Sequence, residues 1–147
     1  MLFRERLRVP LAWWLLAALF AVSLLAAFGA YLGPVWGIGV GAATMAAATA
    51  LFTALAIRVS VDATELRVGR AVVERAYVGS CRALDAEATE RRGGVQADAR
   101  AHLVLRPYIA TSVEIELTDP DDPVPYWLVS TRTPARLAAA LGAPTAS

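Results

Sequence analysis

One long stretch of this chain contains no charged side chain. The 49 residues from Val9 to Ile57 include no Asp, Glu, Lys, Arg or His. As a single helix they would extend about 74 Å at 1.5 Å per residue, whereas the hydrocarbon core of a bilayer is about 30 Å thick. The stretch therefore predicts a hairpin of two transmembrane helices.

The turn of this hairpin is expected within the sequence FGAYLGPVWG. Gly33 and Pro34 weaken a helix there, and Tyr31 and Trp36 suit a membrane interface. We predict spans near residues 11–32 and 36–57, so that residues 1–57 form a basic segment followed by the hairpin. The alternative for the first span, a cleaved signal peptide, fits poorly because its apolar stretch exceeds the usual length of about 7 to 15 residues.

Arginines flank the two ends of the hairpin. Arg4, Arg6 and Arg8 precede the first span and Arg58 follows the second, while the connecting loop carries no charge. Cytoplasmic flanks are enriched in basic residues. We therefore predict a multi-pass protein of the plasma membrane with both termini in the cytoplasm.

Small residues recur at every fourth position of the second span. Gly37 and Gly41 form a GxxxG motif, and Ala42, Ala46, Ala50 and Ala54 continue with a small residue at every fourth position. Such residues let helix backbones approach closely. The contact is either with the first span of the same chain or with a protein partner, including a second copy; an alanine-rich proteome is a third explanation.

Residues 58–147 form a polar region of balanced charge, with 11 Arg and 12 acidic residues. Nucleic-acid binding normally requires a basic surface, so this balance argues against a nucleic-acid partner. Membrane lipid remains an expected partner because of the hairpin.

Alternation of apolar and polar residues predicts a mainly β domain in this region. In SVEIELT, Val113, Ile115 and Leu117 face one way and Glu114 and Glu116 the other. Other expected strands lie at 58–61, 65–68, 71–74, 77–84, 102–105 and 126–131, with a mobile loop at 85–99. A helix is expected near 134–141, with Thr133 as N-cap, Pro134 at its first position and Gly142 after its end.

This order of seven strands and one C-terminal helix resembles the pleckstrin-homology-like (PH-like) domains of bacterial membrane-associated proteins. The resemblance covers about residues 58–142. It implies a small antiparallel barrel closed by the C-terminal helix, on the cytoplasmic side of the membrane.

A second resemblance covers nearly the whole chain. The motifs RERLRVPLAWW, LRVG, LRPYI and DPDDPVPYWLVSTRTP are similar to those of a family of small alanine-rich actinobacterial two-span membrane proteins of unknown function. The family implies a membrane location and supplies no catalytic residues.

The last of these motifs places Asp119, Asp121 and Asp122 between two expected strands. Asp and Pro favour tight connections, and the spacing differs from that of a calcium-binding EF-hand loop. We interpret the stretch as a turn and expect no metal or cofactor.

The chain has one cysteine, Cys81, and one histidine, His102. Neither has a companion motif for a disulfide, a zinc site or a nucleophile–base pair. We expect a buried, inert thiol, an ordinary strand histidine and no enzymatic activity.

One group of side chains remains as a candidate binding surface, because Arg and aromatic residues dominate interface energies. Its members are Arg106, Tyr108, Asp119, Asp122, Tyr126, Trp127 and Arg132. The alternative is structural: Trp127 belongs to the core, and Arg106 and Arg132 pair with Asp119 or Asp122.

These features predict a non-enzymatic interaction module anchored at the cytoplasmic face of the plasma membrane. The alternative function is an accessory subunit, in which the hairpin supports a larger membrane protein complex. The sequence identifies neither the ligand nor the partner.

Overall fold

The computed structural model describes residues 2–142 and divides the chain into two compact units. One unit is Arg8–Ala56; the other holds the described residues of Met1–Leu7 and Ile57–Ser147. The predicted cytoplasmic location of the C-terminus concerns residues 143–147, which lie outside the described part of the chain.

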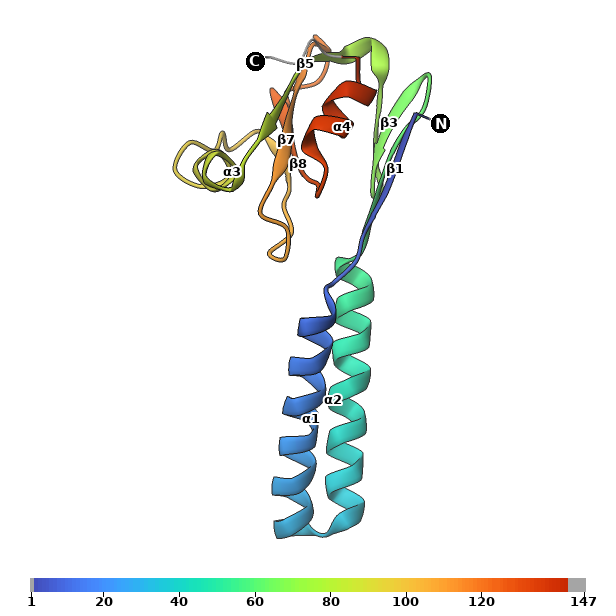
Figure 1. Cartoon of the computed structure of the whole chain (residues 1–147), viewed down its shortest axis with the longest axis vertical. Coiled ribbons are helices and arrows are strands. Elements are labelled where there is room, and N and C mark those ends of the chain that lie inside the picture. Colours follow the sequence, from blue (N-terminus) through green and yellow to red (C-terminus); the bar gives the residue numbers. More distant parts are fainter. Residues whose placement is uncertain (1, 143–147) are drawn as a thin grey trace. The chain divides into compact units, whose positions relative to one another are not determined.

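The first unit is a pair of helices, α1 (Leu11–Leu32) and α2 (Pro34–Leu55), shown in Figure 1. Both are long and apolar enough to cross a membrane. The turn is tighter than predicted, since Gly33 alone joins them with a φ of 100° and Pro34 occupies the first turn of α2. The second helix therefore lies about two residues earlier than expected.

Backbone contact holds the hairpin together at Gly37. A Cβ at this position would lie 2.6 Å from the Leu25 carbonyl oxygen and 2.8 Å from the Gly29 Cα. Further along, Phe52 packs edge-on against the rings of Trp13 and Trp14, with centroids 6.2 and 4.9 Å away. The two glycines of the GxxxG motif thus face α1. This agrees with the alternative in which the motif packs against the first span of the same chain.

The alanines of the stripe do not share this face. Gly37 and Gly41 are buried, whereas Ala46 and Ala50 are exposed. Because an α-helix turns about 100° per residue, each step of four advances the stripe by about 40° around α2. The stripe therefore winds away from α1.

The second unit contains two four-stranded sheets. Sheet A has the order β1-β2-β3-β4 and is antiparallel throughout. Its strands are β1 (Phe3–Leu7), β2 (Ile57–Val61), β3 (Glu65–Val68) and β4 (Ala71–Glu74). A 3-10 turn, η1 (Arg75–Tyr77), leads from β4 to sheet B.

Sheet B has the order β5-β7-β8-β6. Its strands are β5 (Val78–Leu84), β6 (His102–Val104), β7 (Ser112–Leu117) and β8 (Tyr126–Ser130). The helix α3 (Ala86–Gly93) lies between β5 and β6 in the chain, and α4 (Pro134–Ala140) follows β8. The helix α4 lies between the two sheets (Figure 1). Leu137 and Ala138 of this helix, and Leu141 after it, join buried side chains of both sheets in the main core.

The prediction of a mainly β domain with a C-terminal helix is confirmed, but that of a closed antiparallel barrel is not. In the described residues the strands form two separate sheets, and β6 runs parallel to β8. The reason is the strand order: β7 and β8 are antiparallel neighbours, and β6 lies on the far side of β8.

Three local predictions need correction. Residues 3–7, expected as a basic flank, form β1, because Phe3 and Leu7 alternate with exposed Arg4 and Arg6. The expected loop 85–99 contains α3, which begins where Asp85 accepts a hydrogen bond from the Ala88 amide. The Thr133 side chain does not cap α4; Gly142 does follow the helix with a φ of 72°.

Candidate functional site

The Asp-Pro stretch forms the connection between β7 and β8. The Asp119 carboxylate accepts a hydrogen bond from the Asp121 amide, and the Asp122 carboxylate accepts one from the Val124 amide, each at 2.9 Å. These are local turns of the kind that Asp favours, so the interpretation as a turn is confirmed. No group of three metal-ligating side chains occurs among residues 2–142.

Tyr126 and Trp127 point to opposite faces of sheet B, because successive strand residues alternate. Trp127 belongs to the core between the sheets and its ring lies 5.1 Å from that of His102. Tyr126 belongs to a smaller cluster on the α3 side, where its hydroxyl accepts a hydrogen bond from the Asp98 amide. Each is only 5% exposed.

Arg106, Tyr108 and Arg132 lie at the other end of β8 from the Asp-Pro turn. The Arg106 amide donates to the Ser130 hydroxyl at 2.9 Å. Burial raises the pKa of Tyr108, and the nearby guanidinium groups of Arg106 and Arg132 oppose this shift. The structure thus brings these three residues together.

The seven predicted surface residues are therefore divided. Asp119 and Asp122 precede β8 and Arg132 follows it, and five strand residues span about 16 Å. Tyr126 and Trp127 are buried on opposite faces between them. The two aspartates and Arg132 thus lie near opposite ends of β8.

A polar contact from the N-terminus reaches the same end of β8. The Glu5 carboxylate in β1 accepts hydrogen bonds from the Thr131 hydroxyl and, at 3.0 Å, from the Arg132 amide. Thr131 is fully buried. The sequence alone did not indicate this contact, because Glu5 in β1 of sheet A and Thr131, which follows β8 of sheet B, are distant in the chain.

Cys81 and His102 occupy the two edges of sheet B. Cys81 pairs with Ile115, Ile115 with Trp127, and Trp127 with His102. Three strand-to-strand spacings of about 4.8 Å therefore separate Cys81 from His102. The pair is thus about 14 Å apart, too far for a nucleophile and its base. Burial raises the pKa of the Cys81 thiol to about 11, as expected for an inert thiol.

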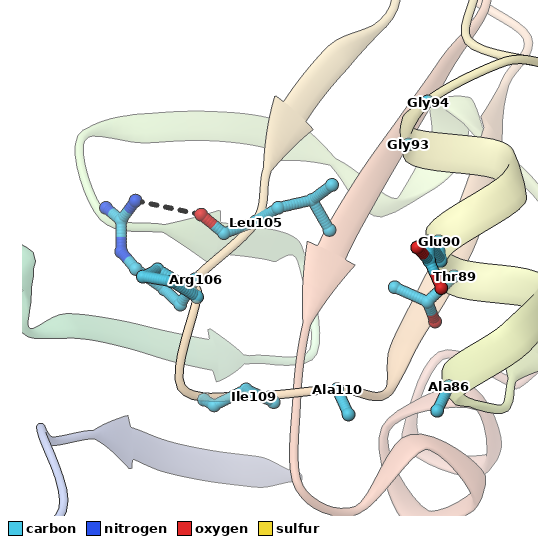
Figure 2. Close-up of a pocket in the computed structure, with 10 residues that line it drawn as sticks. Ala86, Thr89, Glu90, Gly93, Gly94, Leu105, Arg106, Ile109 and Ala110 are labelled. Carbon is cyan, nitrogen blue, oxygen red and sulfur yellow. Dashed lines mark hydrogen bonds between the residues drawn. The ribbon is translucent and has the colours of Figure 1, made fainter.

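A groove of the β unit lies between α3 and the segment 105–110 and has a volume of about 590 Å³. Figure 2 shows Thr89 and Glu90 on the α3 side and Leu105, Ile109 and Ala110 on the other. On α3 the lining positions are 86, 89, 90 and 93, which share one face of a helix. We call this the α3 groove.

The α3 groove is mainly apolar with few polar groups. The Thr89 hydroxyl is already hydrogen-bonded to Ser112 at 2.8 Å. The Arg106 guanidinium turns away from α3 and donates to the Leu105 carbonyl at 3.2 Å (Figure 2). The groove can therefore receive an apolar group, with the Glu90 carboxylate beside it.

The α3 groove was not predicted from the sequence, because residues 85–99 were expected to form a loop and α3 lies within them. The signal was present in the helix start at Asp85 and the glycine pair Gly93-Gly94 at the end. What the sequence did not indicate is the partner wall, since residues 105–110 are brought to α3 only by the order of the strands.

The family comparison matches nearly the whole chain. Residues 2–141 match the family described as Protein of unknown function (DUF3093), and the chain belongs to this family. The expectation of a family of unknown function is confirmed. Neither the curated proteins nor the solved structures gave a significant match.

Proposed function

We propose that this DUF3093 protein is a non-enzymatic interaction module, held at the cytoplasmic face of the plasma membrane by its two-helix hairpin. The observation that carries the proposal is the presence, in one chain, of two 22-residue apolar helices and a separate β unit with an open groove. The hairpin serves as anchor and the β unit as receptor.

Exposure along the helices supports the anchor. Leu15, Leu19 and Phe20 of α1 and Ile38 and Leu51 of α2 expose more than half of their surfaces. Helices that are apolar all round are stable in apolar surroundings. Arginines on both flanks support the cytoplasmic placement of both ends.

Two finer features belong to the same proposal. A relationship of the β unit to PH-like domains is supported by its two sheets and by the C-terminal helix, whose side chains pack in the core that the sheets share. An actinobacterial origin is supported by the abundance of alanine and by basic residues that are all arginine.

A binding role rather than a catalytic one is supported by the positions of the reactive side chains. Cys81 is buried on one edge of sheet B and His102 lies on the other. In the α3 groove the only carboxylate is that of Glu90. This chemistry suits capture of a protein segment that carries an apolar side chain next to a cation.

The test is to fill the groove. Ala110→Trp should abolish capture of a partner in mild detergent and leave the melting temperature unchanged, because Ala110 is exposed. Val72→Trp is the control, since Val72 is exposed on β4 outside the groove. Equal capture by wild type and Ala110→Trp would contradict the proposal.

The accessory-subunit alternative has one supporting observation, the exposed Ala46 and Ala50 on α2. Small residues suit close contact with another membrane helix. An integral-membrane partner that is lost with Ala46→Leu and Ala50→Leu, and retained with Ala110→Trp, would favour the subunit.

A further inference from the structure

A second pocket lies on the opposite flank of α3 from the groove. It has a volume of about 280 Å³ and is lined by Arg82 and Leu84 of β5, Ala88, Arg91 and Arg92 of α3, and Gln96. The α3 members differ from those of the α3 groove. We call it the arginine pocket.

Three guanidinium groups in this pocket contact two carboxylates, those of Glu114 and Glu87. Arg92 donates to Glu114 through two nitrogens, at 2.6 and 3.4 Å, and Arg82 reaches the same carboxylate at 3.5 Å. Among residues 2–142, Arg91 meets only Glu87, at 3.7 Å, and Glu87 is 79% exposed. The three arginines and their two partners, Glu114 and Glu87, leave a net charge of +1 at the pocket.

The three arginines differ in exposure and in their contacts. Arg92 is fixed, because it also lies 4.2 Å from the centre of the Tyr126 ring and donates to the Gln96 carbonyl. Arg82 and Arg91 have side chains 58% and 57% exposed. Their exposed guanidinium groups are therefore the ones that can contact a ligand, whereas Arg92 is engaged with Glu114 and Gln96.

Helix electrostatics account for only part of this arrangement. Arg91 and Arg92 lie in the last turn of α3, where cations complement the helix dipole. Arg82, however, comes from β5 and does not belong to that turn. Arg82 faces Glu114 across the β5–β7 pair, so that guanidinium groups from a strand and from a helix line one pocket.

We propose that the arginine pocket binds a phosphate group that has at most one ester bond. The guanidinium fork matches phosphate oxygens in a bidentate manner, and the surplus of guanidinium groups over carboxylates favours an anion. The group is carried either by inorganic phosphate or by the headgroup of a lipid such as phosphatidic acid. The inference uses only the β unit and does not depend on the α3 groove.

The experiment measures the melting temperature of the full chain in neutral detergent, at constant ionic strength, with inorganic phosphate or with short-chain phosphatidic acid. Binding to the folded state raises the melting temperature. We expect Arg82→Gln and Arg91→Gln each to weaken binding about tenfold, because each removes one charged donor. Arg70→Gln, in the turn between β3 and β4, is the control and should behave as wild type.

Each outcome decides the proposal. A response to both probes supports a site for the phosphate group itself, and a response to phosphatidic acid alone supports a lipid headgroup. No response to either probe would overturn the proposal, as would equal responses from wild type, Arg82→Gln and Arg91→Gln.

Discussion

The hairpin and the β unit use the same apolar residue types in opposite ways. Leu15, Leu16 and Leu19 of the hairpin are 63 to 65% exposed, whereas Leu66 and Leu128 of the β unit are fully buried. The β unit hides its apolar surface within itself. The hairpin leaves its apolar surface outside, and in our proposal lipid covers it.

The two regions also differ in what holds them together. The β unit depends on large side chains such as Trp127 between its sheets. The hairpin depends on the absence of a side chain at Gly37, where the backbones meet. Losing volume should therefore damage the β unit, and gaining volume should damage the hairpin.

The largest expected effect is the loss of a core ring. Trp127→Ala should lower the free energy of unfolding of the β unit by about 3 to 5 kcal/mol, because it removes a buried aromatic side chain. Chemical denaturation followed by circular dichroism measures it. Leu19→Ala in the hairpin is the control and should leave this transition unchanged; a Trp127→Ala transition equal to wild type would contradict a core role.

Alkaline pH should weaken the β unit through Cys81. The unfolded thiol loses its proton near pH 9, whereas the folded thiol keeps it up to a pKa of about 11. Stability therefore falls as pH rises from about 9 to about 11, by about 3 kcal/mol in total. Denaturation of Cys81→Ala over the same range should show a shallower fall, and identical slopes would refute the assignment.

Adding one methyl group should loosen the hairpin. Gly37→Ala places a Cβ against the Leu25 carbonyl and the Gly29 backbone, so the helices must separate at a cost of about 1 to 3 kcal/mol. Gly39→Ala is a matched control, because no atom lies within 4 Å of its Cβ. Cross-linking between cysteines at Ala18 and Met45, which line one cleft, should fall for Gly37→Ala only.

The smallest effect is expected at the Asp-Pro turn. Asp122→Ala removes the hydrogen bond to the Val124 amide and should cost about 1 kcal/mol. Asp121→Ala, an exposed neighbour, should cost less. Calcium should shift neither melting temperature; stabilisation of wild type alone by calcium would show that the carboxylates bind metal.

Local patterns predicted the elements of this chain well. The charge-free stretch and alternation in segments such as 112–117 located the helices and most strands, because these signals depend on neighbouring residues. β1 was missed because Arg4 and Arg6 fit both a membrane flank and the exposed face of a strand.

The candidate sites were less predictable because they depend on long-range pairing. Several of the seven residues of the predicted surface are close together in the sequence but not in the fold. Strand alternation places Tyr126 and Trp127 on opposite faces of sheet B, and the length of β8 separates Asp122 from Arg132. Conversely, Arg82 and Arg92 converge on Glu114 only because β5 pairs with β7 and α3 lies beside them.

The most direct test of the account is the placement of two exposed valines across a membrane. In a Cys81→Ala background, Val35→Cys marks the hairpin turn and Val95→Cys marks the β unit; the side chains are 80% and 95% exposed. Val35 is preferable to Gly33, whose positive φ disfavours cysteine.

A membrane-impermeant maleimide should label Val35→Cys in intact cells and Val95→Cys only after lysis. Labelling of Val95→Cys in intact cells, or of Val35→Cys only after lysis, would contradict a hairpin that holds the β unit in the cytoplasm.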